Sequence, residues 1–159
     1  MKRDLNEMEC RMLCQCAIEA RKLSYCPYSH FAVGAALLSA DGTVFTGCNI
    51  ENAAYTPSIC AERTAFSKAV SEGHVSFTAI AIAGGPREPD PAEQHGEDNS
   101  ISPISLPLCP PCGVCRQVMM EFCDPDSFRI LLVSSASEYT VYTLKELLPL
   151  GFGPENISS

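Results

Sequence analysis

Two cysteine-bearing segments that lie far apart in the sequence restrict the fold more than any other feature of this chain. The segment LCPPCGVCRQ carries Cys109, Cys112 and Cys115 at two-residue gaps, and the segment SICAERTAF carries Cys60. A tetrahedral zinc ion needs four donors, and one C-x-x-C pair supplies only two thiolates. If these cysteines bind zinc, the fold must bring Cys60 beside the second segment.

Three cysteine ligands would leave one position of a tetrahedral zinc ion open. This ligand count is typical of catalytic zinc, whereas structural sites usually fill all four positions with protein. Cys60 is predicted to begin a helix, where the amide dipoles stabilise a thiolate and lower its pKa. Three thiolates would leave one excess negative charge, which Arg63 is placed to offset. The alternatives are a structural zinc knot and, for Arg63, an ordinary solvated arginine.

The N-terminal sequence, the number of cysteines and the net charge indicate in which compartment the protein works and which partners it has. The N-terminal stretch lacks the apolar core and cleavage site of a secretory signal. We therefore expect a soluble protein of the reducing cytoplasm, where metal binding or burial explains ten cysteines better than disulfides do. No apolar run approaches the roughly 20 residues of a membrane span. The net charge of −8 repels phosphate backbones, so neither a membrane nor a nucleic-acid polymer is an expected partner.

Six cysteines lie outside the two segments, on a predicted helix or singly among apolar residues. Free cysteine behaves as a small hydrophobe. We therefore expect simple packing for Cys10, Cys14, Cys16, Cys26, Cys48 and Cys123.

The chain of 159 residues is long enough for one domain with its own core. Apolar residues every three or four positions predict a first helix, with Asp4 as its cap, and Asp41-Gly42 predicts a hairpin turn. Gly73 is expected to close the second helix. This order of elements predicts a three-layer α/β/α sandwich around a mixed five-stranded sheet, within a single domain spanning 1–159. The predicted helices cover residues 5–23, 60–73, 112–123 and 144–149, and the predicted strands cover 31–39, 43–50, 77–84, 129–135 and 139–144.

One segment fits no predicted element. Residues 85–108 read GPREPDPAEQHGEDNSISPISLPL and are rich in proline, acidic residues and serine. This composition favours a mobile loop insertion over an ordered connection. A substrate lid is the alternative, although the segment has neither aromatic residues nor paired glycine hinges.

The two cysteine segments together form a known signature. C-A-E followed downstream by P-C-x-x-C is the pattern of the zinc deaminases, and here it reads Cys60-Ala61-Glu62 and Pro111-Cys112-Gly113-Val114-Cys115. This register makes Cys60, Cys112 and Cys115 the zinc ligands and leaves Cys109 as the spare. The rival pair, Cys109 with Cys112, would place ligands on both sides of two prolines.

Further stretches extend the resemblance over most of the chain outside the 85–108 insertion. They are CPYSHFAVGAALL, GCNIENAAY, ICAERTA, PCGVCRQ and ELLP followed by FGPE. The sequence resembles the short, homotetrameric, zinc-dependent cytidine deaminases. The resemblance implies one Zn²⁺ per subunit, and hydrolytic deamination of cytidine and 2′-deoxycytidine to uridine and 2′-deoxyuridine with release of ammonia, in pyrimidine salvage.

The resemblance also assigns roles to individual residues. Glu62 would act as general base and then general acid, moving protons from the attacking water to N3 and to the departing amino group. An acidic residue that only complements the helix dipole is the alternative for Glu62. Asn49 and Glu51 would bind the ribose, chiefly its 3′-hydroxyl; without the zinc motif, NIEN reads as a polar turn. The resemblance further places Phe31, Tyr55, Ala61 and Phe152 against the substrate, with Phe152 reaching a neighbouring subunit and Tyr55 at the interface.

Two rival functions share part of this pattern. An aminohydrolase acting on a cytosine-bearing antibiotic, or on a cytosine in RNA, would keep the zinc motif, but the pair Asn49 and Glu51 and the acidic net charge argue against both. A zinc-binding interaction module without enzyme activity would need a fourth protein ligand and would not need Glu62.

Overall fold

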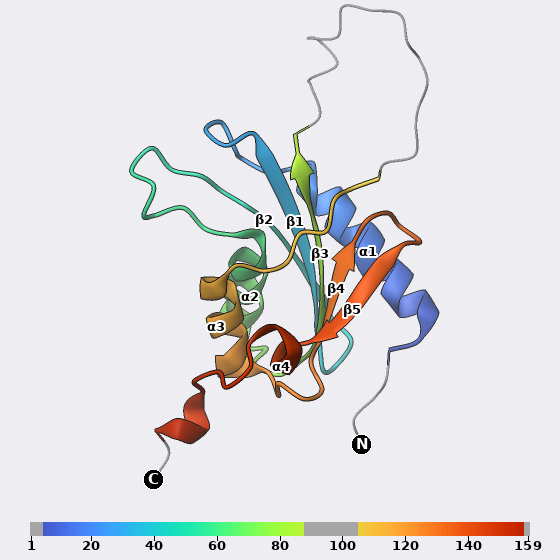
Figure 1. Cartoon of the computed structure of the whole chain (residues 1–159), viewed down its shortest axis with the longest axis vertical. Helices are drawn as coiled ribbons and strands as arrows, with labels where there is room; N and C mark the ends of the chain where they lie inside the picture. The colour runs from blue at the N-terminus through green and yellow to red at the C-terminus, as the bar shows by residue number, and fades with distance from the viewer. Residues whose placement is uncertain (1–4, 88–104, 158–159) are drawn as a thin grey trace, which may run out of the picture.

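The computed structural model describes residues 5–87 and 105–157 (Figure 1). None of the helices among these residues has the length and apolar character needed to cross a membrane. Each predicted helix and strand is present, with ends that differ from the prediction by a few residues. The elements are α1 (Glu7–Arg21), β1 (Phe31–Ser39), β2 (Val44–Cys48), α2 (Ala61–Ser71), β3 (Phe77–Pro86), α3 (Gly113–Phe122), β4 (Arg129–Val133), β5 (Tyr139–Thr143), α4 (Leu144–Leu147) and the 3₁₀ turn η2 (Pro154–Asn156).

The five strands form one mixed sheet in the order β2-β1-β3-β4-β5. β3 and β4 pair in parallel, whereas the other three neighbouring pairs are antiparallel. A parallel pair needs a crossover connection, and α3 lies in this connection. The predicted mixed five-stranded sheet is confirmed.

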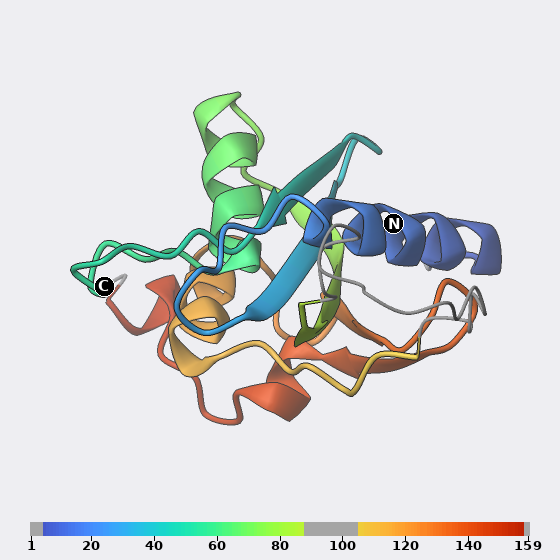
Figure 2. The same cartoon turned by 90° about the horizontal axis from the view of Figure 1, so that it is seen from above.

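Helices cover both faces of the sheet, so the molecule has three layers (Figures 1 and 2). α1 lies on one face, and α2 and α3 lie on the other. The alternation along β4 shows the same division, because Ile130 and Leu132 pack with α2 and α3 whereas Leu131 and Val133 pack with α1. The predicted α/β/α sandwich is confirmed.

α1 approaches β1 closely at a glycine. A Cβ atom on Gly34 would lie 2.1 Å from the carbonyl oxygen of Ala17, which no side chain tolerates. The cap of α1 differs from the prediction: the Asn6 side chain accepts a hydrogen bond from the backbone N–H of Glu9, and the Glu9 carboxylate accepts one from the backbone N–H of Asn6. The prediction of Asp4 as the cap is wrong, because this reciprocal capping box lies two residues further along; Asp4 itself is outside the described residues.

Two glycine turns agree with the prediction. Gly42 has φ +95° in the β1–β2 hairpin, where the backbone N–H of Ser39 donates to Thr43 at 2.9 Å. Gly73 has φ +92° just after α2 and so ends that helix. Left-handed backbone of this kind favours glycine.

The predicted loop insertion is shorter at both ends than its composition indicates. β3 continues through Gly85 and Pro86. Leu106 is buried, and its backbone N–H donates to Ser134 at 2.8 Å. The predictions of a mobile loop and of a lid concern residues 88–104, which lie outside the described residues.

Candidate active site

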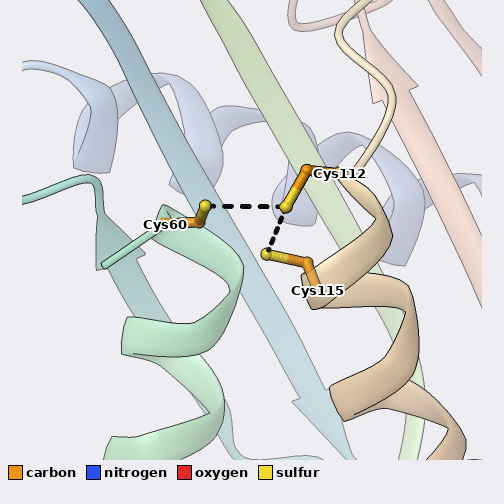
Figure 3. A group of neighbouring side chains, drawn as sticks. All are labelled: Cys60, Cys112 and Cys115. Atoms are coloured by element: carbon orange, nitrogen blue, oxygen red, sulfur yellow. Dashed lines mark hydrogen bonds between the residues drawn. The ribbon is translucent and has the colours of Figure 1, made fainter. Parts of the chain in front are cut away.

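The starts of α2 and α3 lie side by side and carry three thiols (Figure 3). Cys60 is the N-cap of α2 and Cys112 is the N-cap of α3, both with extended backbone. Neither helix start has a side-chain cap hydrogen bond. The positive ends of two helix dipoles therefore face the same small volume, and both favour thiolates.

The spacing of the thiols fits a zinc ion. Sγ of Cys60 lies 3.8 Å from Sγ of Cys112, which lies 3.5 Å from Sγ of Cys115, and all three sulfurs are within 4.8 Å of one another. Zinc–sulfur bonds of about 2.3 Å in a tetrahedron place sulfurs roughly 3.8 Å apart. Within residues 5–87 and 105–157, no other group of three histidine, cysteine or acidic side chains is placed to hold a metal. Three thiols leave a fourth tetrahedral position for a non-protein ligand.

Cys109 lies outside this group. Its thiol packs on Gly84, where an added Cβ would come within 2.4 Å of the Cys109 sulfur. Burial raises the pKa of the Cys109 thiol to about 11. The packing of this thiol on Gly84, away from the other three sulfurs, suits the role of spare cysteine rather than that of ligand.

A second glycine positions the start of α2. A Cβ atom on Gly47 would lie 2.4 Å from the carbonyl oxygen of Ala61 and 2.6 Å from the amide nitrogen of Ala65. The hydroxyl of Thr64 donates to the carbonyl of Cys48 at 3.0 Å, which ties the same turn to the end of β2. The helix therefore docks on β2 with Cys60 held at its first turn.

Arg63 lies beside the thiols, as the sequence predicts. Its Nη2 is 3.6 Å from Sγ of Cys60. The pKa of Cys60 is lowered to about 5 by a hydrogen bond from Cys115, with further contributions from Arg63 and Cys112, whereas the same bond raises the pKa of Cys115. Nε of Arg63 is buried and has no hydrogen-bond partner among the described residues. The Nε–H of Arg63 is therefore left as a donor that could bind a further anionic group at this site.

Glu62 is a buried carboxyl group in the first turn of α2. Its exposed fraction is only 4%, and burial raises its pKa to about 7. The charge on Cys60 makes a smaller contribution to this raised pKa, and both the protonated and the ionised form of Glu62 are accessible near neutral pH. This arrangement suits a group that accepts and returns protons.

Asn49 follows β2, and its side-chain amide is anchored to the start of β1. Its Oδ1 accepts from the backbone N–H of Val33 at 2.8 Å and from the hydroxyl of Ser24, while its Nδ2 donates to the carbonyl of Phe31 at 2.8 Å. Both lone pairs of Oδ1 are thereby used, and one N–H of Nδ2 remains. Asn49 can therefore only donate to a ligand.

The Glu51 carboxylate binds the backbone of the turn that precedes β1. Its Oε1 accepts from the backbone N–H groups of Tyr28 at 3.0 Å and Ser29 at 3.1 Å. Ile50 forms an isolated β-bridge with Ile59, the residue before Cys60. This bridge places the Asn49–Glu51 segment next to the thiol-bearing start of α2.

The remaining predicted substrate-binding residues fall into two groups. Ala61 is buried directly after Cys60, and Phe31 is partly exposed at the start of β1. Tyr55 is 73% exposed and Phe152 is 59% exposed. Tyr55 meets Tyr28 edge to face at 6.1 Å, and the carbonyl of Phe152 accepts from Nε2 of Gln117 at 2.9 Å. Among the contacts of the described residues, none brings either ring to the thiols of the same chain.

Two residues with a part in this geometry are not among the predicted site residues, although Arg116 lies in the PCGVCRQ stretch. Ser24 holds the amide of Asn49, and Arg116 binds two backbone carbonyls beside the site. A serine before the YCPYS stretch and an arginine after Cys115 are the only signals, and neither indicates its partner. Both roles depend on segments that meet only in the folded chain.

Comparisons with known proteins agree with this geometry. Residues 8–129 match the family model described as the cytidine and deoxycytidylate deaminase zinc-binding region. A cytidine deaminase of Sporosarcina psychrophila is 45% identical over 140 residues, covering 88% of each chain. A cytidine deaminase of Halalkalibacterium halodurans is 42% identical over 151 residues, covering 95% of this chain and 99% of that protein.

A solved structure shows the same fold. The crystal structure of cytidine deaminase from Burkholderia pseudomallei superposes with a TM-score of 0.70 at 40% identity, covering 89% of this chain and 97% of that chain. The family match spans the three thiols and Glu62, and its zinc-binding description fits the spacing of the sulfurs. This chain belongs to the cytidine and deoxycytidylate deaminase family of zinc enzymes.

Proposed function

We propose that this chain hydrolyses the 4-amino group of cytidine and 2′-deoxycytidine, which yields the uracil nucleoside and ammonia. The observation that carries this proposal is the buried carboxyl of Glu62 beside three thiols spaced for one zinc ion. The relatives with 45% and 42% identity are named cytidine deaminases, which supports the same substrate class. A cytosolic role in pyrimidine salvage is consistent with ten cysteines that are all free thiols.

Cys60, Cys112 and Cys115 are the proposed ligands of one zinc ion per chain. Bound zinc supplies a Lewis acid that makes water nucleophilic near neutral pH. Arg63 offsets the excess negative charge of three thiolates, and its contact with Cys60 supports this role. By lowering the excess negative charge beside the thiols, Arg63 would favour ionisation of the attacking water.

Glu62 is the proposed carrier of protons. It accepts a proton from the attacking water and gives it to N3 of the pyrimidine, while the water oxygen bonds to C4. It then accepts the proton of the new C4 hydroxyl and gives it to the amino nitrogen. The C4–N bond breaks, the C4 carbonyl forms and ammonia leaves. The burial of Glu62 supports this cycle, because bulk water cannot replace the carboxyl as the proton acceptor.

Asn49 and Glu51 are the proposed ribose ligands, and their hydrogen bonds define which sugar group fits. Asn49 has one N–H left as a donor. Oε1 of Glu51 accepts from two backbone N–H groups, and Oε2 is the other acceptor of this carboxylate. A hydroxyl can accept from Asn49 and donate to Glu51 at the same time. A phosphate group brings negative charge toward the Glu51 carboxylate, so we expect nucleosides rather than nucleotides as substrates.

We further propose a homotetramer with shared active sites. Several apolar side chains in the segments next to the site are exposed, and two of them, Tyr28 and Tyr55, contact each other, as is expected of residues that a neighbouring chain covers. Phe152 stacks on the pyrimidine in a neighbouring chain, Tyr55 lies at the interface, and Phe31 and Ala61 contact the substrate in their own chain. The exposed apolar residues of these segments are Tyr25, Tyr28, Phe31, Ile50 and Tyr55.

The direct test is turnover of cytidine by purified, zinc-loaded protein. We expect loss of the cytidine absorbance band with an equal amount of ammonia, and much weaker activity on cytidine 5′-monophosphate. No turnover of either nucleoside by protein that retains zinc would contradict the proposed reaction. Equal turnover of cytidine and its 5′-monophosphate would contradict the proposed ribose contacts.

A further inference from the structure

Arg116 follows Cys115 in α3, and its side chain turns back toward the start of the helix. Its Nε donates to the carbonyl of Pro111 at 2.7 Å, and its Nη1 donates to the carbonyl of Leu147 at 2.6 Å. Pro111 is the residue directly before Cys112. One guanidinium therefore joins the backbone that leads into Cys112 to the last residue of α4.

This bridge matters because the chain before Cys112 offers few backbone donors, so that its attachment depends on the buried ring of Pro111 and on carbonyl groups that accept hydrogen bonds. Pro110 and Pro111 have no backbone N–H, so neither can donate a hydrogen bond. Cys112 caps α3 without a side-chain hydrogen bond and is exposed, whereas Cys115 is 1% exposed. Of the two thiols from α3, that of Cys112 is therefore the one whose position depends on how the preceding backbone is held.

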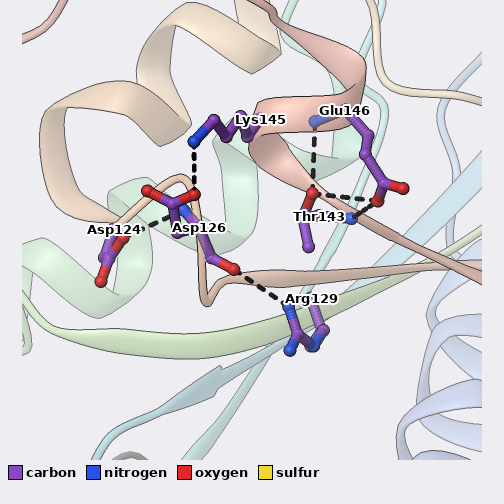
Figure 4. A network of polar contacts seen from close by, with 6 residues as sticks. All are labelled: Asp124, Asp126, Arg129, Thr143, Lys145 and Glu146. Carbon is purple, nitrogen blue, oxygen red and sulfur yellow. Dashed lines mark hydrogen bonds and ion pairs between the residues drawn. The ribbon is translucent and has the colours of Figure 1, made fainter.

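Leu147, whose carbonyl accepts the second hydrogen bond of Arg116, belongs to a helix that is anchored at both its start and its core-facing side. Leu144 of α4 is fully buried, and Leu147 packs against the core formed with α2 and α3. The start of α4 carries a reciprocal cap in which Thr143 accepts from the backbone of Glu146 at 3.2 Å and the Glu146 carboxylate accepts from the backbone of Thr143 at 2.7 Å (Figure 4). Arg116 thus binds a carbonyl whose own helix is anchored.

We infer that Arg116 is a positioning residue that holds Cys112 at the distance from Cys60 and Cys115 that zinc requires. The inference rests on the proposed three-thiolate site and extends it. Arg116 differs in this from Arg63, which contacts a sulfur directly and acts through its charge. Arg116 acts through two backbone carbonyls and hence through geometry.

The test measures metal binding in Arg116→Met and Arg116→Lys, with Arg129→Met as the matched control. Methionine keeps much of the length of the side chain but makes neither hydrogen bond, and lysine reaches one carbonyl rather than two. Arg129 also donates to a backbone carbonyl, that of Asp126 at 3.2 Å, at the start of β4 away from the thiols. Zinc affinity is measured by competition with a chromogenic chelator, and cobalt-substituted protein reports thiolate geometry through its charge-transfer and ligand-field bands.

We expect Arg116→Met to lower zinc affinity by about 10- to 100-fold, as removal of partners of metal ligands commonly does, and to shift the cobalt bands. Arg116→Lys should recover part of both, and Arg129→Met should match the wild type. Wild-type affinity with unchanged cobalt bands in folded Arg116→Met would overturn the inference. So would failure of both Arg116 variants to fold, because the residue would then serve the fold rather than the ligand. Wild-type protein without thiolate–cobalt bands would instead refute the proposed zinc site itself.

Discussion

At the scale of single residues, the site differs from ordinary surface groups in two ways: its carboxyl group is buried, and its thiols lie at the starts of helices. Glu62 is the only buried acidic residue within the described part of the chain. The three thiols meet where two helices begin, and Cys109, three positions before Cys112, faces Gly84 instead. Position relative to the helix start therefore distinguishes the three cysteines proposed as ligands from Cys109.

Single cysteine replacements test this distinction. We predict that Cys112→Ala and Cys115→Ala lose zinc and deaminase activity, because two thiolates no longer hold the ion in a three-ligand site. Cys109→Ala should keep both, with a loss of about 1 kcal/mol in the free energy of unfolding for the small cavity. Zinc per chain, measured by atomic absorption on purified protein, checks all three variants. Zinc loss in Cys109→Ala together with zinc retention in Cys115→Ala would show that the ligands are Cys109 and Cys112.

At the scale of elements, α3 contacts both the cluster of three thiols and the C-terminal segment. Its first turn carries Cys112 and Cys115, and Gln117 in the next turn binds the carbonyl of Phe152 in the C-terminal segment. The same helix thus carries two proposed zinc ligands and contacts the backbone of the residue proposed to reach a neighbouring chain. Displacement of the C-terminal segment should therefore affect substrate binding without affecting zinc.

The variant Gln117→Leu separates these two functions of α3. A lost hydrogen bond of about 0.5–1.5 kcal/mol predicts a rise in KM of about 2- to 10-fold with unchanged zinc content. The matched control is Gln15→Leu, which removes an exposed amide–carboxylate contact with Glu19 on α1. In a Phe152→Ala background, Gln117→Leu should have no further effect, because the ring that it positions is gone. Additive effects of the two changes would show that Gln117 acts independently of Phe152.

The elements were largely predictable from the sequence, whereas the contacts between them were not. Apolar patterns predict the four α-helices and five strands of the described residues but not the 3₁₀ turn η2, and the Asp41-Gly42 pair identifies the hairpin. The deaminase signature also groups Cys60 with two later cysteines by sequence pattern alone. The anchoring of Asn49 by Ser24 and the bond from Arg116 to Leu147 join positions far apart in the chain. No local pattern encodes such pairs, because each partner is a backbone group or an ordinary polar side chain.

At the scale of the whole molecule, the proposed homotetramer implies that one chain alone presents an incomplete site. The thiols, Glu62 and Asn49 are brought together within the chain, but Phe152 lies exposed on the segment after α4. Pyrimidine rings stack favourably on aromatic side chains, with about 0.5–1.5 kcal/mol beyond the burial of area. A neighbouring chain that supplies this ring would complete the site and cover exposed apolar surface in one step.

Mixed assemblies test the shared site. We predict that co-expressed Glu62→Gln and Phe152→Ala chains give more turnover per chain at low cytidine concentration than either variant alone. Some sites in the mixture then combine an intact Glu62 with a neighbour's intact Phe152. The composition of the assemblies is measured by native mass spectrometry with one chain tagged, and turnover is compared with each parent. Absence of this gain in verified mixed assemblies would place Phe152 outside the neighbouring site, and a fully active wild-type monomer would refute the shared site.

We propose above that Glu62 carries protons for deamination at a site where three thiolates hold zinc. The most direct measurement is cytidine turnover per bound zinc in Glu62→Gln compared with the wild type. Glutamine keeps the shape of the side chain but cannot accept and return protons. We predict wild-type zinc content and assembly with turnover reduced by several orders of magnitude. Turnover within about tenfold of the wild type at equal zinc content would contradict the claim.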